Sequence, residues 1–155
     1  MQEIVKKLTS LNKTISIMES CTGGALANEI TNIEGASEVF KFGAVTYSNE
    51  FKIKMKINAS LIDKYSVYSQ EVANNMAYTI ANFTNSNYAV GITGKLNKVD
   101  KYNLYSDNDV VYVSIYDKDL DKYYELKIKL EKKNRLECKQ EVINEIIKLL
   151  KKIVL

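Results

Sequence analysis

The stretch TISIMESCTGGALA, residues 14–27, decides the fold class. TISI is short, apolar and partly β-branched, which is typical of a buried strand. It runs directly into two hydroxyls, a thiol and two adjacent glycines, which predict a turn into a helix that continues to about Asn32. A buried strand followed at once by a helix indicates an α/β protein.

Hydrophobic spacing and capping residues predict further elements on both sides of this stretch. An amphipathic helix precedes it, formed by Met1, Ile4, Val5, Leu8 and Leu11. We expect strands at 43–48 and 87–93, an antiparallel hairpin at 109–117 and 123–130, short helices at 49–56 and 59–65, and longer helices capped by Ser69 and Asn134. The expected inner faces of the two longer helices are Val72, Met76, Ile80 and Phe83, and Ile143, Ile146, Ile147 and Leu150. This order predicts one domain over residues 1–155, a three-layer α/β/α sandwich with a mixed β-sheet.

The composition of the 155 residues excludes several classes of protein. No apolar run approaches the roughly 18 residues of a membrane span, and the periodic N-terminus does not predict a secretory signal. The net charge of +3 is small and the basic stretch at 127–135 has strand-like alternation, so we expect neither a nucleic-acid nor a membrane partner. Cys21 and Cys138 match no metal or redox spacing, which favours a reducing, cytoplasmic location.

Histidine is absent from the chain, which narrows its possible chemistry. Acid–base work must fall to Lys, Tyr, Asp, Glu or Cys. Ser20 stands at the end of the first predicted strand, and the turn at Thr22, Gly23 and Gly24 directs backbone N–H groups toward one point. That arrangement suits a nucleophile beside an oxyanion hole. An ordinary tight turn with a Thr cap has the same pattern.

The segment TYSNEFK, residues 46–52, follows the next predicted strand. It carries Tyr47, Ser48, Asn49 and Lys52, and either Lys52 or Tyr47 is able to take the proton of a serine hydroxyl. A lysine in such a segment is also typical of an exposed surface. Cys21 has no histidine to activate it, and we expect a small buried thiol there.

Four segments in this chain resemble the signature of the CinA C-terminal domain family, the nicotinamide mononucleotide amidohydrolases. They are MESCTGGALANEITNIEGASEVFKFGAVTYSNEFK at 18–52, SVYSQEVANNMA at 66–77, AVGITG at 89–94 and NRLECKQEVINEIIKLL at 134–150. These segments occur in the family's order and span nearly the whole chain.

The resemblance implies a cytoplasmic, metal-independent hydrolase without a cofactor, which converts nicotinamide mononucleotide and water to nicotinate mononucleotide and ammonia. It also implies a homodimer. Ser20 falls on the family's serine, expected as the nucleophile, and Tyr47 and Lys52 fall on residues expected to activate it. The expected substrate-binding residues are Thr22, Gly23, Gly24, Ser48, Asn49, Gly94 and Arg135. Arg135 is suited to a phosphate, although a cation at a helix start is equally typical of a solvent-facing residue, and Lys139 stands where a second arginine is usual.

The chain departs from the family pattern after Gly94. A Gly/Pro-rich loop is usual there, whereas this sequence has GKLNKVDKYNLYSDNDVVYVSI from residue 94 onward. If the loop at 95–108 forms one wall of the pocket, its replacement indicates a rebuilt pocket, an altered substrate or lost activity; a surface loop free to vary is the other interpretation. Two further hypotheses follow: a non-catalytic nucleotide-binding or regulatory module, and a lysine-rich nucleic-acid accessory protein, which no basic patch interleaved with aromatic residues supports.

Overall fold

A computed structural model describes residues 1–96, 109–131 and 134–155 of the chain. At its centre is a five-stranded sheet in the order β2-β1-β3-β4-β5. The strands are β1 (Ile15–Glu19), β2 (Phe40–Val45), β3 (Tyr88–Gly94), β4 (Val110–Asp117) and β5 (Lys122–Lys129). β1 is parallel to both β2 and β3, whereas β4 and β5 are antiparallel to their neighbours, so the predicted mixed sheet is confirmed.

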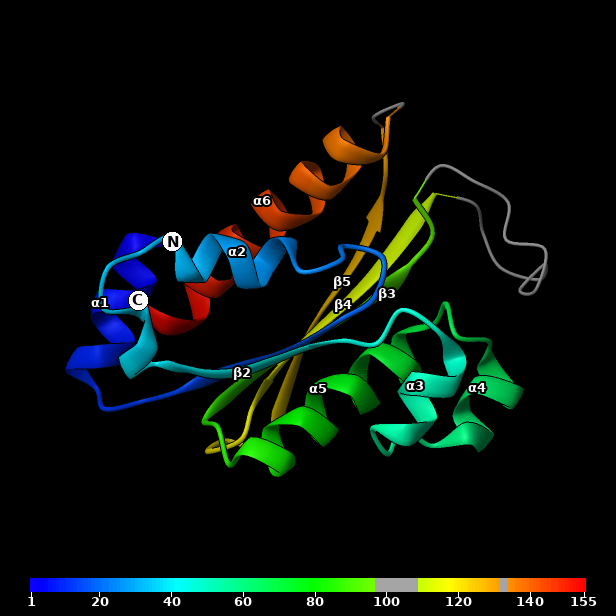
Figure 1. Ribbon diagram of the computed structural model, residues 1–155, viewed down its shortest axis with the longest axis horizontal. Helices are drawn as coiled ribbons and strands as arrows, with labels where there is room; N and C mark the ends of the chain where they lie inside the picture. The colour runs from blue at the N-terminus through cyan, green and yellow to red at the C-terminus, as the bar shows by residue number, and fades with distance from the viewer. Residues whose placement is uncertain (97–108, 132–133) are drawn as a thin grey trace.

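Helices cover both faces of this sheet, which confirms the predicted α/β/α layers (Figure 1). One face carries α1 (Gln2–Ser10), α2 (Ala25–Thr31) and α6 (Arg135–Val154). The other carries α5 (Gln70–Thr84), with α3 (Asn49–Lys54) and α4 (Ala59–Tyr65) beside it. A short 3-10 helix, Ala36–Glu38, leads into β2. Among the described helices, none is both long enough and apolar enough to cross a membrane.

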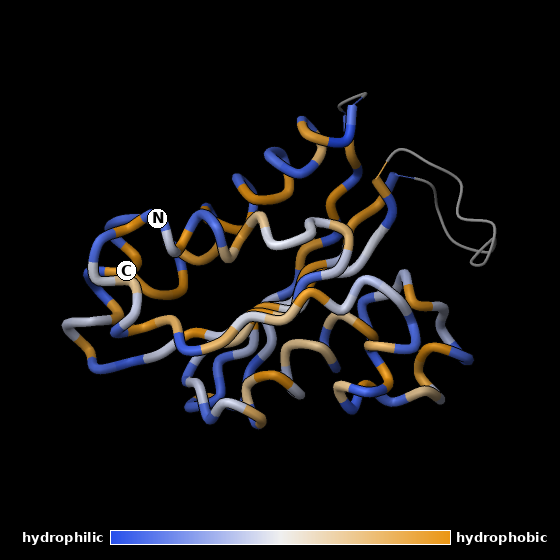
Figure 2. Tube along the Cα trace, viewed as in Figure 1, coloured by the Kyte–Doolittle hydropathy of each residue, from blue (hydrophilic) through white to orange (hydrophobic). Residues whose placement is uncertain are grey.

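Each face of the sheet has its own apolar cluster, and the apolar residues gather between the layers (Figure 2). β1 is buried on both sides: Ile17 packs toward α2 and α6, and Met18 packs toward α5. Gly91 in β3 allows α5 to lie directly on the sheet, because a Cβ there would come within 2.3 Å of the Ala73 carbonyl oxygen. The two clusters therefore pack the strands between the helices from both faces of the sheet.

Local sequence explains where the helices begin. Ser69 caps α5 by accepting a hydrogen bond from the Val72 N–H at 3.3 Å, and Asn134 caps α6 through the Glu137 N–H at 2.9 Å. Both predicted caps are confirmed. The predicted hairpin is also confirmed, and the alternate residues of β5, Lys127 and Lys129, lie exposed as expected.

Two predictions about the β2 side of the sheet were wrong. The strand runs over Phe40–Val45 rather than 43–48. Phe83 is 68% exposed rather than part of the inner face of α5. That inner face advances in steps of four residues through Val72, Met76 and Ile80, so Phe83 points past the edge of the sheet, where its ring lies 5.5 Å from that of Phe42.

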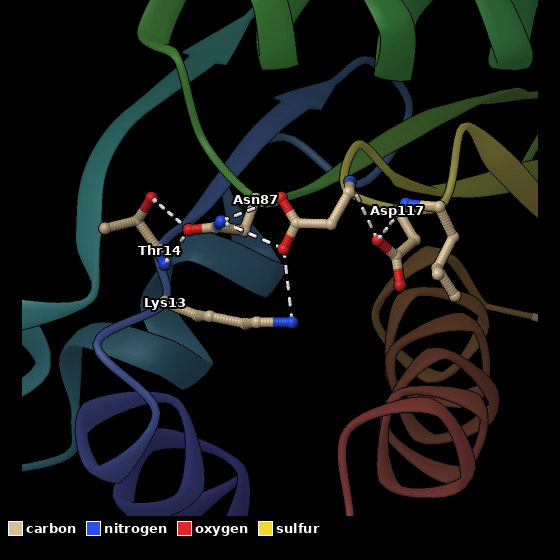
Figure 3. Close-up of polar contacts among 6 residues, drawn as sticks. Lys13, Thr14, Asn87 and Asp117 are labelled. Carbon is tan, nitrogen blue, oxygen red and sulfur yellow. Dashed lines mark hydrogen bonds and ion pairs between the residues drawn. The ribbon is translucent and has the colours of Figure 1, made fainter.

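A polar network ties together the amino ends of β1 and β3 (Figure 3). The Asn87 side chain accepts from the Thr14 N–H at 3.0 Å and donates to Asp119, which also pairs with Lys13 at 3.1 Å. Asp117 accepts from the Asp119 N–H at 3.1 Å and so orders the β4–β5 turn. This network stabilises the end of the sheet opposite to Ser20.

Candidate active site

The carboxyl ends of β1, β2 and β3 meet at one edge of the sheet, since these three strands are parallel. Ser20, Thr46 and Lys95 each follow one of these strands. In Figure 1 this edge lies between the start of α6 and the pair α3 and α4. Ligands of open α/β sheets bind at such an edge.

Ser20 and Lys52, which the sequence places 32 residues apart, contact each other here. The Lys52 Nζ donates to the Ser20 Oγ at 2.9 Å and to the Thr46 carbonyl oxygen at 2.7 Å. Ser48 caps α3 by accepting from the Phe51 N–H, so that Lys52, one turn later, faces inward and is only 1% exposed. Burial lowers the pKa of Lys52 to about 8, because the charged ammonium loses its hydration. A large part of the Lys52 population is therefore neutral near pH 8 and able to accept a proton.

Glu19 is a residue of this site that the sequence analysis missed. Its carboxylate is 1% exposed and accepts hydrogen bonds from the Thr22 hydroxyl and from the N–H groups of Gly24, Leu26 and Ala27. Glu19 therefore binds the first turn of α2 and holds the turn after Ser20 in place. The only signal in the sequence is an acidic residue at the end of an otherwise buried strand.

The glycine turn offers fewer free donors than its sequence predicts. The Gly23 N–H donates to the Ser20 carbonyl oxygen at 3.0 Å, and the Gly24 N–H donates to Glu19. Of the three predicted N–H donors, that of Thr22 alone has no acceptor within the described ranges. Gly24 is the N-cap of α2, so the Thr cap proposed as the alternative is not formed. Both glycines have positive φ, +61° and +95°, which explains their use here.

Tyr47 and Arg135 form a separate contact at the rim of the site. Tyr47 is 62% exposed, and its hydroxyl accepts from the Arg135 Nη2 at 3.1 Å. The Arg135 Nη1 donates to the Leu96 carbonyl oxygen at 2.7 Å. Among the described residues, Tyr47 makes no hydrogen bond to Ser20 or Lys52. Arg135 therefore links the ends of β2 and β3 to the start of α6.

The remaining predicted binding residues lie at different depths. Asn49 is half-buried at the first position of α3. Lys139 extends from α6 over the glycine turn, with its Nζ 3.3 Å from where a Cβ on Gly23 would be. Gly94 is buried within β3, and a Cβ there would come within 2.6 Å of the Val110 carbonyl oxygen. Packing against β4 thus explains Gly94 without a ligand.

The thiol of Cys21, considered as an alternative nucleophile, is buried. Burial raises its pKa to about 12, despite the nearby cations of Lys52 and Arg135. The thiol therefore stays protonated and is a poor nucleophile. Most of the loop at 95–108, the predicted opposite wall of the pocket, lies outside the described residues; Lys95 and Leu96 belong to the described part.

Comparison with known proteins gives one family. The CinA C-terminal domain model matches residues 1–154. Two proteins described as putative competence-damage inducible proteins, from Thermoanaerobacter pseudethanolicus and Alkaliphilus oremlandii, are 43% and 46% identical over 96 residues. The matched segment is 61% of this chain but only 23% of each relative, so the match spans about a quarter of the length of those proteins.

Solved structures show the same fold. A CinA superfamily protein from Klebsiella pneumoniae 700603 superposes with a TM-score of 0.87 at 16% identity, over 96% of this chain and 91% of that one. The competence/damage inducible protein CihA from Agrobacterium tumefaciens gives a TM-score of 0.84 at 24% identity, over 96% and 92%. At these identities the likeness concerns the fold alone.

Proposed function

Because this chain belongs to the CinA C-terminal domain family, we propose that it hydrolyses the carboxamide of nicotinamide mononucleotide to nicotinate mononucleotide and ammonia. The observation that carries the proposal is the hydrogen bond from the buried Lys52 to Ser20, together with the lowered pKa of Lys52. A serine hydroxyl becomes a useful nucleophile when a base of matched pKa lies within hydrogen-bond distance. Lys52 meets both conditions in a chain without histidine.

The proposed reaction has two halves. Neutral Lys52 takes the proton of Ser20 as the Oγ attacks the carboxamide carbon, and the Thr22 N–H donates to the oxyanion that forms. Lys52 then gives the proton to the departing nitrogen, the C–N bond breaks, and ammonia departs, which leaves the nicotinoyl group of the mononucleotide as an ester on Ser20. Water attacks this ester, Lys52 accepts its proton, and the proton returns to the Ser20 Oγ as nicotinate mononucleotide departs. No metal or cofactor takes part in these steps.

The rim residues have a binding role in this proposal. Tyr47 acts through Arg135 rather than on Ser20, since its exposed hydroxyl accepts from the guanidinium. Ser48 acts as the cap that sets the direction of Lys52. Arg135 and Lys139 supply positive charge near the turn at Gly23. We place the reaction in the cytoplasm, where the buried free thiols of Cys21 and Cys138 remain reduced.

A homodimer is part of the same proposal. β2 is an edge strand, and its Phe42 and Val45 are 38% and 51% exposed, so it presents unpaired backbone and apolar surface. Light scattering at micromolar concentration is expected to give twice the mass of the chain. A monomer mass would contradict this part of the proposal without affecting the chemistry.

The experiment that tests the hydrolase proposal measures ammonia released from nicotinamide mononucleotide by the purified chain. Ser20→Ala is expected to lower the rate at least about 1,000-fold, because the ester can no longer form. Ser37→Ala, at an exposed position before β2, is the matched control and is expected to keep full activity. No ammonia from the unaltered chain, or equal rates with and without Ser20, would contradict the proposal.

The sequence after Gly94 favours a second candidate, a mononucleotide-binding module without turnover, since that segment lacks the glycines and proline usual in the family. Isothermal titration calorimetry separates the two candidates. Tight binding of the mononucleotide without ammonia release would support the module, and sustained turnover would exclude it.

A further inference from the structure

Lys95 is a buried lysine on the same face of the sheet as Ser20. Its side chain lies over the ring of Tyr68, with 5.2 Å from the Nζ to the ring centroid, and Tyr68 packs against the α5 cluster. Ser20 faces the same layer, because its partner Lys52 belongs to α3. Lys95 is only 4% exposed. Lys95 therefore lies inside the layer that holds the Ser20–Lys52 pair rather than on the outer surface of the molecule.

Lys95 lies further along the strand direction than Ser20, the proposed nucleophile. β1 and β3 are parallel with Met18 beside Gly91, so Ser20 is level with Thr93 when this register is continued. Lys95 is two residues further, about 7 Å along the strand direction. A group that contacts Lys95 while Ser20 attacks a carboxamide therefore lies at the far end of the substrate from the amide.

The backbone around Lys95 is firmly held. The Lys95 N–H donates to the Val110 carbonyl oxygen at 3.1 Å. The Thr93 hydroxyl donates to the Val67 carbonyl oxygen at 2.8 Å and so fixes the segment that carries Tyr68. Ser69, the residue after Tyr68, caps α5 and so anchors this segment a second time. The two backbone segments that carry Lys95 and Tyr68 are therefore both anchored where the ammonium meets the ring.

A phosphate at this edge of the sheet needs a side-chain cation, because the backbone N–H groups of the nearest helix start already bind Glu19. The first turn of α2 would ordinarily offer its N–H groups to a phosphate, but Glu19 already occupies those of Gly24, Leu26 and Ala27. Lys95 lies at the start of the segment in which this chain lacks the glycines that would bring backbone N–H groups to a nucleotide. A lysine ammonium supplies the same interaction as a point charge.

We infer that Lys95 binds the phosphate monoester of the nucleotide substrate and thereby determines specificity for phosphorylated over unphosphorylated amides. The inference rests on the proposed function for the location of the amide. It adds a phosphate contact on the α5 face of the sheet, whereas α6, on the opposite face, places Lys139 over the glycine turn and Arg135 against Leu96 and Tyr47.

Steady-state kinetics of Lys95→Met on two substrates test the inference. The substrates are nicotinamide mononucleotide and its nucleoside, which lacks the phosphate. We expect the KM for the mononucleotide to rise about 10- to 100-fold, the range for a lost hydrogen bond to a charged group. The kcat, and the KM for the nucleoside, should change less than about threefold, and Lys95→Arg should restore most of the mononucleotide affinity because it keeps the charge.

Lys122→Met is the matched control, since Lys122 also lies over a tyrosine ring, 4.6 Å from the centroid of Tyr124, but on the exposed β5. It should alter neither KM. If Lys95→Met shifts both substrates by the same factor, or neither, Lys95 has a packing role and the inference is wrong.

Calorimetry with the product nicotinate mononucleotide separates this inference from the proposed function. If the unaltered chain binds this product but does not hydrolyse nicotinamide mononucleotide, the hydrolase proposal fails, while weaker binding of the product by Lys95→Met still supports the phosphate contact. Binding that Lys95→Met leaves unchanged overturns the inference alone. A chain that neither binds nor hydrolyses the mononucleotide overturns both.

Discussion

On one side of the candidate site the ends of β1 and β2 meet α3, and on the other the end of β3 is reached from α6. Glu19, Ser20 and Lys52 on the first side are each at most 6% exposed and contact one another's segments through short hydrogen bonds. On the second side Lys95 is buried, but Arg135 is exposed and reaches across the rim to the exposed Tyr47 after β2. The first side thus holds its side chains in a fixed geometry, whereas the second side supplies positive charge.

This difference predicts which substitutions should change kcat and which should change KM. Changes on the Ser20 side should lower kcat, because they alter the base and the nucleophile at the reacting atoms. Changes on the β3 side should raise KM with less effect on kcat, since they remove charge that holds the substrate.

Lys52→Met should have the largest effect, a loss of roughly 1,000-fold in kcat, as expected when a general base is removed. Methionine keeps the length of the buried side chain without the amine, so circular dichroism should remain unchanged. Lys54→Met is the control, because Lys54 lies on the same helix but is exposed and paired with Glu50. Equal losses in both variants would show that α3 matters only as a structural element.

The pH dependence of kcat should follow the protonation of Lys52. Its pKa is lowered to about 8 by burial, and the reaction needs the neutral amine, so kcat should rise about tenfold per pH unit below 8 and level off above it. A rate that is flat from pH 6 to pH 9 would exclude Lys52 as the base.

The free energy of unfolding should depend on pH through the same lowered pKa of Lys52. The folded value is about 8 and the unfolded value 10.5, so between these pH values the unfolded chain binds more protons and the free energy of unfolding rises with pH. Relative to Lys52→Met, the rise should total about 3 kcal/mol, complete above pH 10.5. Urea denaturation of the unaltered chain and of Lys52→Met at pH 7 and pH 10.5 measures this rise. If the unfolding free energies of both proteins change equally between the two pH values, the pKa of Lys52 is not lowered.

Glu19→Gln should have the next largest effect. An amide in place of the carboxylate puts a donor against the N–H groups of Leu26 and Ala27 and removes the negative charge from the first turn of α2. We expect a loss of about 2–3 kcal/mol in unfolding free energy and a fall of about 10- to 100-fold in kcat, with KM changed less. Glu38→Gln, at an exposed position, is the control.

Much of the fold could be predicted from the spacing of apolar residues, because the strands and helices alternate along the chain and each shows a clear hydrophobic period. Ser20 stood at the end of one predicted strand and Lys52 in the segment after the next one, and the structure brings their side chains together. The burial of Lys52 was not visible, since lysines are usually exposed. Glu19 was missed because most of its partners are backbone N–H groups, which converge on the carboxylate only once the turn has formed. Phe83 was misplaced because helical periodicity does not tell where a sheet ends.

The contact of Arg135 with Leu96 and Tyr47 was likewise invisible in the sequence, since it joins segments 39 and 88 residues apart. Its replacement should give the smallest of these effects. Arg135→Lys keeps the charge but not the planar fork that reaches both oxygens, so the link between the β2 and β3 ends is lost. We expect KM to rise about three- to tenfold, and unfolding free energy to fall by less than about 1 kcal/mol because the site is exposed.

Tyr47→Phe removes the hydroxyl from the same contact, so the two substitutions should not be additive. The double variant should resemble Arg135→Lys alone, with kcat within about threefold of the unaltered chain. A kcat loss in Tyr47→Phe as large as that of Lys52→Met would place Tyr47 in the chemistry of the Ser20 side. The division between a side for rate and a side for binding would then no longer hold.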